Sequence, residues 1–325
     1  MSGIASNRWV IGARVKTLPA AVVPVLVGTA LAWRVPPGVV PKNSCSSCVM
    51  SVDMSRTSWG GIDWINAVLA LVVAVLLQVA TNYANDYSDG KRGTDNVGLR
   101  IGPPRMVGNG LATVDEVKAA TFATFGLAGI AGLVLCLRSE PWLVVIGVAC
   151  VLAGYFYTGG SQPYGYLGFG EVSVFIFFGL VATTGSTFVQ LRTVPWQSVL
   201  AGLMLGCLSM ALLMVNNIRD IPGDTKSNKM TLAVRLGSAN ARRAYVSMMA
   251  APFLLLPIFA GIGDRPVASI AFVALVLATQ PAVATLHGAA GLNLLPVLAR
   301  TARVQLVFGV LLAIGSVLSV ELLVG

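Results

Sequence analysis

Two clusters of Asn and Asp side chains stand out in a chain that is otherwise rich in apolar residues. The first cluster lies within residues 82–95 and the second within residues 216–224, and together they hold five of the 13 acidic residues. Carboxylates that border a lipid bilayer are energetically costly and are rarely retained without a function. These two clusters are therefore the candidate site. Their members are Asn82, Asn85, Asp86, Asp89, Asp95, Asn216, Asn217, Asp220 and Asp224.

The spacing within each cluster predicts that its side chains share one face of a helix. The residues with helical spacing are Asn82, Asp86 and Asp89 (i, i+4, i+7) and Asn216, Asp220 and Asp224 (i, i+4, i+8). Residues three or four positions apart are neighbours on a helix surface. Each cluster also closes a long apolar run, so we expect both at the ends of membrane-spanning helices, on the same side of the membrane.

Two acidic faces that oppose each other across a helical bundle repel one another unless cations lie between them. Magnesium suits this arrangement, because Mg²⁺ takes one or two carboxylates and completes its octahedron with water and phosphate oxygens. Mn²⁺ accepts the same oxygen ligands. We therefore predict Mg²⁺ ions that clamp a diphosphate. The metal-facing carboxylates are predicted to be Asp86, Asp89, Asp220 and Asp224, which are also the predicted catalytic residues, together with Asp95.

Neighbouring basic, amide and aromatic side chains are candidates for substrate binding. Amide groups can orient the carboxylates or the phosphates, and basic groups can contact the diphosphate. For Arg14 and Lys16, contact with membrane head groups is an equally good interpretation. Tyr155 and Tyr157 could offer a hydroxyl or a ring face to an aromatic ring or a carbocation. The complete set is Asn82, Asn85, Asn216, Arg105, Lys91, Lys229, Arg14, Lys16, Tyr155 and Tyr157.

The elements that must position these residues are membrane helices. The chain is 56% apolar with only 11% charged residues, and its mean hydropathy is +0.79, which excludes a soluble enzyme. Charge-free runs of helix length predict an all-α polytopic membrane protein with nine transmembrane helices around a central cavity. The runs cover residues 17–33, 64–85, 119–137, 141–170, 172–191, 193–218, 244–263, 266–299 and 304–320.

The distribution of positive charge predicts how the chain is oriented. A net charge of +9 could indicate nucleic acid or anionic lipid as a partner. However, sixteen of the 22 Lys and Arg residues fall in segments on the same side of the membrane as the N-terminus. The positive-inside rule therefore predicts a cytoplasmic N-terminus in the cell inner membrane, with membrane lipid and no nucleic acid as a partner.

The chain is predicted to form one transmembrane domain over residues 1–325. Residues 35–62 are expected to form a polar extracytoplasmic loop, because the segment is rich in Pro and Ser. Residues 86–113 and 219–243 mix acidic, basic and Gly residues after the two clusters. We expect these two segments to be cytoplasmic cap loops that close over a polar head group and exclude water from the site.

The sequence around the clusters resembles the UbiA superfamily of intramembrane aromatic prenyltransferases. The resemblance is carried by NDYSDGKRGTD at 85–95 and NNIRDIPGDTKSNKMTLAVRLG at 216–237, with supporting stretches at 14–21, 157–160 and 301–305. Within the superfamily the chain looks most like the 1,4-dihydroxy-2-naphthoate prenyltransferases of menaquinone synthesis. It departs from them at Val15 and Ser161, where Pro is usual. The loop before the fifth run lacks the Lys-Arg pair that is typical of relatives that use hydroxybenzoate.

The resemblance implies transfer of a polyprenyl group from polyprenyl diphosphate to 1,4-dihydroxy-2-naphthoate. Mg²⁺ would assist ionisation of the allylic C–O bond, the cation would attack the naphthoate ring, and CO₂ would leave from the same ring carbon, giving demethylmenaquinol and diphosphate. Two alternatives stay open. The acceptor could instead be homogentisate, haem or a lipid phosphate, or the chain could be a divalent-cation channel or transporter.

Overall fold

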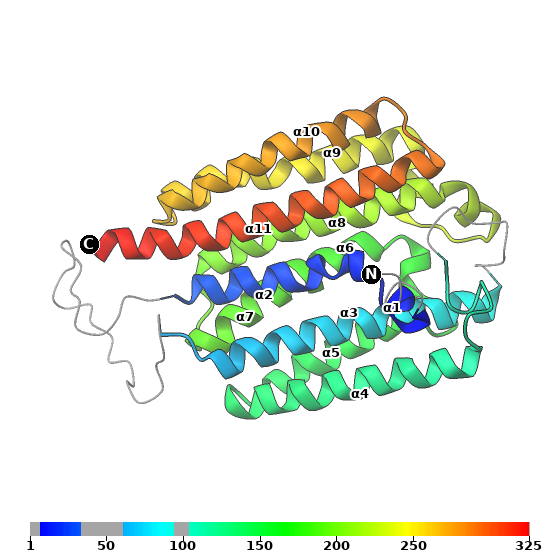
Figure 1. Ribbon diagram of the computed structural model, residues 1–325, viewed down its shortest axis with the longest axis horizontal. Helices are drawn as coiled ribbons and strands as arrows, with labels where there is room; N and C mark the ends of the chain where they lie inside the picture. Colours follow the sequence, from blue (N-terminus) through cyan, green and yellow to red (C-terminus); the bar gives the residue numbers. More distant parts are fainter. Residues whose placement is uncertain (1–6, 34–60, 94–103, 325) are drawn as a thin grey trace.

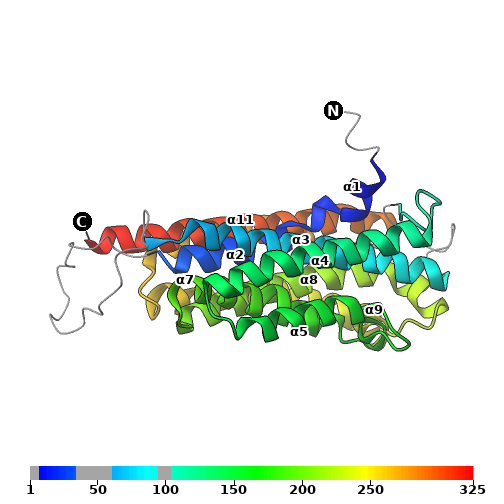
Figure 2. The same ribbon diagram turned by 90° about the horizontal axis from the view of Figure 1, so that it is seen from below.

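The structure is a computed structural model that describes residues 7–33, 61–93 and 104–324. These residues form an elongated bundle whose helices lie side by side along its long axis (Figure 1). The view turned by 90° shows the same lengthwise arrangement (Figure 2). Every regular element of the described residues is a helix, so the predicted all-α fold class is confirmed.

The helices follow one another along the chain in three groups. In the first half they are α1 (Arg8–Ala13), η1 (Val15–Thr17), α2 (Pro19–Leu31), α3 (Trp64–Arg92), α4 (Val114–Arg138) and α5 (Leu143–Phe156). The middle contains η4 (Tyr164–Leu167), α6 (Gly170–Val174), the π-helical η5 (Phe175–Val181), α7 (Ala182–Leu191) and α8 (Trp196–Lys226). The last part contains α9 (Leu232–Gly261), η6 (Pro266–Phe272), α10 (Val273–Leu286), η7 (Gly291–Asn293) and α11 (Leu294–Val324).

Seven helices within the described ranges are long and apolar enough to cross a membrane. The number is eight if the pair Arg8–Thr17 and Pro19–Leu31, which is bent by 51°, forms one span. Helix α5 is apolar but has only 14 residues, fewer than the roughly 20 that a spanning helix needs. The predicted polytopic membrane protein is therefore confirmed, whereas nine crossings stay a prediction.

The predicted boundaries near the C-terminus were wrong. The run 266–299 was expected to be one helix and 304–320 the next, but the chain turns after α10 and α11 already begins at Leu294. The prediction started the last helix after Arg300 and Arg303 because charges were taken to end a membrane span. Charged residues do continue a helix near its end, where long side chains can reach water beyond the apolar region.

Helix α8 forms the centre of the bundle and packs against α9, α11, α2 and η5. Its most apolar window is 72% buried, which is the highest share among the candidate spans of the described residues. Small residues allow close backbone contact on this helix, because a Cβ on Gly179 of η5 would lie 2.4 Å from the Cα of Gly206. The second acidic cluster therefore stands on the best-packed element of the fold.

Both acidic clusters lie at the same end of the bundle, where α3 and α8 end (Figure 1). Of the two expected cap loops, 219–243 is mostly helical, which corrects that loop prediction, whereas in 86–113 the helix ends at Arg92 and residues 104–113 are not helical. Helix α3 continues to Arg92 before Gly93 ends it with φ +71°, and only the residues between Lys226 and Leu232 separate α8 from α9. Several of the polar side chains at these helix ends are buried inside the bundle, among them Asp86, Asp89 and Asp224. Nearly all of the predicted loop 35–62 lies outside the described residues.

Candidate functional site

A cavity of about 130 Å³ lies between the polar ends of α3 and α8. Side chains from both acidic clusters line it, so the two clusters face a common space. The lining residues are Arg14, Asn85, Asp89, Arg105, Tyr157, Thr158, Leu213, Asn216, Asn217, Arg219, Asp220, Pro222, Gly223, Asp224, Ser227 and Lys229. They combine carboxylate, amide and guanidinium groups, a composition suited to a charged ligand.

The second cluster presents one face of α8 to this cavity. Asn216, Asp220 and Asp224 all line it, as their spacing predicts. Arg219 donates from Nε to Oδ1 of Asp220 at 2.7 Å and from Nη2 to Oδ2 at 2.6 Å, a bidentate pair in which the Arg219 side chain is almost completely buried. Asp224 accepts a long hydrogen bond of 3.4 Å from the hydroxyl of Thr231, the N-cap of α9.

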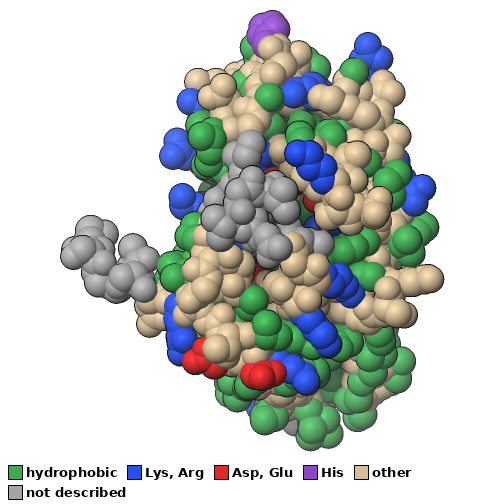
Figure 3. All heavy atoms as spheres, turned by 90° about the vertical axis from the view of Figure 1, so that its right-hand side faces the viewer, with side chains coloured by type: hydrophobic (Ala, Val, Ile, Leu, Met, Phe, Trp, Pro, Cys, Tyr) green, Lys and Arg blue, Asp and Glu red, His purple; other side chains and the backbone are tan. Residues whose placement is uncertain are grey.

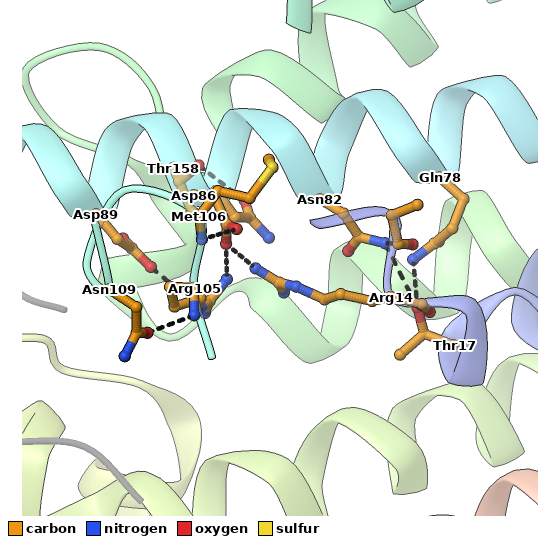
Figure 4. A network of polar contacts seen from close by, with 12 residues as sticks. Arg14, Thr17, Gln78, Asn82, Asp86, Asp89, Arg105, Met106, Asn109 and Thr158 are labelled. Atoms are coloured by element: carbon orange, nitrogen blue, oxygen red, sulfur yellow. Dashed lines mark hydrogen bonds and ion pairs between the residues drawn. The ribbon is translucent and has the colours of Figure 1, made fainter. Parts of the chain in front are cut away.

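In the first cluster, Asp86 is held by two arginines (Figure 4). Arg14 donates from Nη2 to Oδ1 of Asp86 at 2.6 Å, and Arg105 donates to the same oxygen. The backbone N–H of Met106 donates to Oδ2 at 3.1 Å. Asp86 is completely buried and does not line the cavity, whereas both arginines do. The carboxylate thus fixes two guanidinium groups at the cavity wall.

Asp89 lines the cavity one turn further along α3. The hydroxyl of Tyr166, from η4, donates to Oδ1 of Asp89, and Nη2 of Arg105 lies 3.8 Å from Oδ2. The ring of Tyr166 also contacts two cations, with Nζ of Lys229 at 4.8 Å and Cζ of Arg92 at 5.2 Å from its centre. Tyr166 therefore contacts the end of α3 and the segment after α8 at once.

A backbone bend places Arg14 at the cavity. Arg14 has φ +51° and ends α1, so the chain turns there before α2 begins. A positive φ is uncommon for a residue with a side chain and needs support from its surroundings. Asn82 supplies that support from α3, because its amide donates to the carbonyl of Ala13 at 2.9 Å and lies 3.4 Å from Oγ1 of Thr17 (Figure 4).

Part of the cavity wall carries uncharged side chains. Leu213 and Asn217 line it from α8, and Tyr157 lines it from the C-terminal end of α5. Asn217 donates to Oε1 of the fully buried Glu171 at 2.9 Å. Burial raises the pKa of the Tyr157 phenol and the nearby charge of Glu171 adds to this effect, so the hydroxyl stays protonated at neutral pH.

Of the 15 predicted site residues, nine line the cavity, five described ones do not, and one lies outside the described residues. Those that line it are Asn85, Asp89, Arg105, Asn216, Asp220, Asp224, Lys229, Arg14 and Tyr157. Lys16 and Lys91 are exposed, the first in η1 and the second near the end of α3. Tyr155 packs on the rings of Phe122 and Phe156 instead. Asn82 supports the α1 bend, Asp86 lies behind the two arginines, and Asp95 lies outside the described residues.

Several residues of the site were not predicted from the sequence. They are Arg219, Tyr166, Thr158 and Glu171, whereas Asn217 was predicted only as a member of the second cluster. Arg219 adjoins Asp220, but sequence neighbours on a helix usually point in different directions. Thr158 donates to Oδ1 of Asn85 at 2.8 Å, a contact between residues 73 positions apart that no local pattern reveals.

The donors at this cavity suit a hard cation such as Mg²⁺. Carboxylates of Asp89, Asp220 and Asp224 and amide groups of Asn85 and Asn216 line it from two sides. Mg²⁺ typically takes one or two protein carboxylates and keeps water or phosphate oxygens as its other ligands. Among the described residues, no three His, Cys, Asp or Glu side chains come close enough together to hold a metal ion by themselves. Oxygen donors on two sides of a cavity fit an ion that also binds phosphate.

Positive side chains surround this end of the molecule. Lys and Arg side chains are spread around the rim when the bundle is viewed from the end at which α3 and α8 terminate (Figure 3). Such a distribution attracts anionic ligands and raises their local concentration near the cavity. The electrostatics of this end therefore favour a phosphate-bearing substrate.

Comparison with known proteins gives the same picture. The chain is 41% identical to 1,4-dihydroxy-2-naphthoate octaprenyltransferase of Mycobacterium tuberculosis over 94% of this chain and 95% of that protein. It is 36% identical to the Escherichia coli protein of the same name over 78% of this chain and 76% of that protein.

Solved structures share the fold. A UbiA homolog from Aeropyrum pernix K1 has a TM-score of 0.65 at 15% identity and covers 93% of this chain and 98% of its own. A UbiA homolog from Archaeoglobus fulgidus bound to GPP and Mg²⁺ has a TM-score of 0.57 at 13% identity, and the match covers 94% of this chain and 99% of that chain. The UbiA prenyltransferase family model matches residues 46–290. The resemblance predicted from the two motifs is thus confirmed, and the chain belongs to the UbiA prenyltransferase family.

Proposed function

We propose that the protein transfers a polyprenyl group from polyprenyl diphosphate to 1,4-dihydroxy-2-naphthoate. The allylic C–O bond breaks with its electron pair going to diphosphate, and a C–C bond forms between the allylic carbon and the ring carbon that bears the carboxylate. That carboxylate then leaves as CO₂, and its bonding electrons restore the aromatic ring. The products are demethylmenaquinol, CO₂ and diphosphate.

One structural observation supports this reaction most directly. Carboxylates from α3 and α8 face the same cavity, and arginines from three different segments line it beside them. Relatives at 41% and 36% identity carry the name 1,4-dihydroxy-2-naphthoate octaprenyltransferase over most of their length. The departing diphosphate gains negative charge, and a cavity that presents fixed positive groups lowers the energy of that state.

The residues have distinct tasks in this proposal. Arg14, Arg105 and Lys229 contact the diphosphate from the cavity wall, where guanidinium groups match phosphate oxygens with paired donors. Asp89, Asp220 and Asp224, which line the cavity, would hold Mg²⁺. Asp86 positions Arg14 and Arg105 and would be a further candidate ligand of the ion. When bound, Mg²⁺ supplies Lewis-acid stabilisation of the leaving group, and Mn²⁺ can replace it.

The proposed membrane orientation places this cavity at the cytoplasmic side of the cell inner membrane. It is supported by Lys and Arg side chains around the end at which α3 and α8 terminate (Figure 3). Reporter fusions test the orientation. A fusion truncated after Arg105 should report a cytoplasmic location and one truncated after Arg192 the opposite side. The opposite result for both fusions would contradict the proposed orientation but would not contradict the proposed reaction.

Product identification tests the function. Purified protein in detergent or liposomes receives Mg²⁺, a polyprenyl diphosphate and 1,4-dihydroxy-2-naphthoate, and mass spectrometry follows the prenylated, decarboxylated product. Parallel reactions contain hydroxybenzoate or homogentisate as the acceptor. Turnover of one of these and none of dihydroxynaphthoate refutes the proposed acceptor. Chelation of Mg²⁺ with EDTA should stop product formation, and added Mg²⁺ or Mn²⁺ should restore it.

A further inference from the structure

Glu171 is a buried carboxyl group to which the proposed reaction gives no task. It lies near the start of α6 and its side chain is completely buried. Oε1 accepts the hydrogen bond from Asn217, but no donor among the described residues reaches Oε2. A buried carboxylate oxygen without a donor is costly, and membrane proteins rarely keep such a group without a function.

The contact with Glu171 determines how the Asn217 carboxamide is turned. Asn217 donates from Nδ2 to Oε1 of Glu171, an oxygen that accepts whether the carboxyl group is ionised or carries its proton on Oε2, so the amide nitrogen of Asn217 faces Glu171. The amide oxygen Oδ1 is then the atom of Asn217 that remains to accept a hydrogen bond from a ligand. Because Asn217 lines the cavity, that ligand would be one bound in the cavity.

The neighbours of Asn217 indicate what kind of ligand this is. Tyr157 and Leu213 line the same part of the cavity, because a Cβ placed on Gly170 would lie 3.1 Å from the Tyr157 hydroxyl and 3.4 Å from Cδ2 of Leu213. Both side chains therefore pack against the start of α6, beside Glu171. An aromatic ring, a leucine and one hydrogen-bond acceptor suit a flat aromatic molecule with a hydroxyl group.

We propose that Asn217 accepts a hydrogen bond from a ring hydroxyl of the aromatic acceptor and that Glu171 is the positioning residue that fixes the Asn217 carboxamide for this contact. The inference rests on the proposed function, because it needs an acceptor with a ring hydroxyl. The two hydrogen bonds form a chain from the hydroxyl through the amide to the carboxylate. Each bond in such a chain polarises the next and strengthens it.

The contact would gain strength during the reaction. As the new C–C bond forms, the ring loses electron density, and the hydroxyl next to the attacked carbon shares the positive charge. Its proton becomes a better donor at that moment, so the bond to Asn217 stabilises the transition state more than the bound acceptor. Loss of CO₂ returns an electron pair to the ring, and the hydroxyl keeps its proton in the product.

The test compares steady-state kinetics of Glu171→Ala, Glu171→Gln, Asn217→Ala and the double alanine variant, with each substrate varied separately. Loss of a hydrogen bond to a charged group predicts a fall in kcat/KM for the acceptor of about 10- to 100-fold in Glu171→Ala and Asn217→Ala. KM for polyprenyl diphosphate should not change. Glu171→Gln should recover much of the activity, because its amide oxygen still accepts from Asn217. The double variant should be no worse than Asn217→Ala.

Gln305→Leu is the matched control. Gln305 is a fully buried polar residue of α11 that donates to Ser209 of α8 at 2.8 Å, and it does not line the cavity. Its substitution should change stability without a selective effect on the acceptor. The proposal is overturned if Glu171→Ala weakens donor and acceptor kinetics equally, if the two alanine effects add, or if Gln305→Leu reproduces the selective loss.

An acceptor analogue separates this inference from the proposed function. Methyl ethers of dihydroxynaphthoate lack the hydroxyl donor, so the wild type should bind them more weakly than it binds dihydroxynaphthoate. Asn217→Ala should bind the ethers and dihydroxynaphthoate with similar affinity. If methylation weakens binding equally in the wild type and in Asn217→Ala, the proposed hydrogen bond between Asn217 and the ring hydroxyl is contradicted. If the wild type turns over homogentisate instead of dihydroxynaphthoate, the proposed function is wrong. The hydrogen bond from the acceptor to Asn217 is then tested with the same variants and with methyl ethers of homogentisate.

Discussion

Arg14 and Asp86 lie 72 residues apart in the chain and are joined by a hydrogen-bonded ion pair of 2.6 Å between Nη2 and Oδ1. The contact links the bend after α1 to the polar end of α3. Asp86 is completely buried, whereas a quarter of the Arg14 side chain is exposed and lines the cavity. The acid thus holds the base where a ligand can reach it.

Arg14→Gln should weaken binding of the diphosphate substrate. The substitution removes a charge-assisted hydrogen bond worth about 1.5–3 kcal/mol, so KM for polyprenyl diphosphate should rise by about 10-fold or more. Initial rates at varied donor concentration measure this. Arg8→Gln is the control, because Arg8 stands on α1 but forms a half-exposed pair with Glu116, and such pairs contribute little. Equal effects of the two variants would contradict the role of Arg14.

Asp86→Asn and Asp220→Asn should each lose most activity. Asn cannot replace the charge that holds Arg14 and Arg105 or that pairs with Arg219, and it is a poor Mg²⁺ ligand. Product formation over a Mg²⁺ titration, with protein folding checked by chromatography, measures the effect. Asp115→Asn, at an exposed position in the first turn of α4, should behave like the wild type. Wild-type rates in either of the first two variants would refute the assignment.

Tyr166→Phe should impair the site without removing the ring that Lys229 and Arg92 contact. The change deletes the hydroxyl that donates to Asp89, and outer partners of a metal-binding carboxylate usually affect metal affinity or activity by about 10- to 100-fold. The half-saturating Mg²⁺ concentration should therefore rise. Tyr164→Phe is matched, since this hydroxyl of η4 donates to the carbonyl of Ala153 instead. A Mg²⁺ requirement unchanged in Tyr166→Phe would exclude the proposed role.

Gly28→Ala should destabilise the bundle, because a Cβ there would lie 2.3 Å from the carbonyl oxygen of Thr183. Overpacking of this kind costs about 1–3 kcal/mol. Thermal unfolding in detergent should show a lower Tm. Gly126→Ala serves as the control, because no atom lies within 4 Å of that Cβ and Ala favours a helix by about 1 kcal/mol over Gly. A Tm that falls equally in both variants would show that the close α2–α7 contact is not the cause.

Local spacing predicted the α8 half of the site better than the α3 half. On α8, the i, i+4, i+8 pattern identifies Asn216, Asp220 and Asp224, and all three line the cavity. On α3, the same reasoning groups Asn82, Asp86 and Asp89, yet only Asp89 lines it. Helical periodicity gives the face of a residue, but it does not show what packs on that face.

The difference between the two halves comes from contacts between distant parts of the chain. Residues 13–17 pack over α3 and engage Asn82 and Asp86, and this arrangement depends on the left-handed backbone of Arg14. No local pattern predicts an αL conformation at an arginine. The loop contacts of Tyr166 and Thr158 are equally non-local. Fold class and the two carboxylate clusters were predictable because hydropathy and helical spacing are local properties.

The bidentate pair of Arg219 with Asp220 has a consequence for how the ligand arrives. Before any substrate enters, this acid and base already neutralise each other inside the bundle, where an isolated buried charge would be unstable. Binding of a phosphate and its counterion then becomes an exchange of partners, in which the base moves to the incoming anion and the acid to the incoming cation. Neither ion alone can satisfy both residues, so entry of the two together is favoured over entry of one.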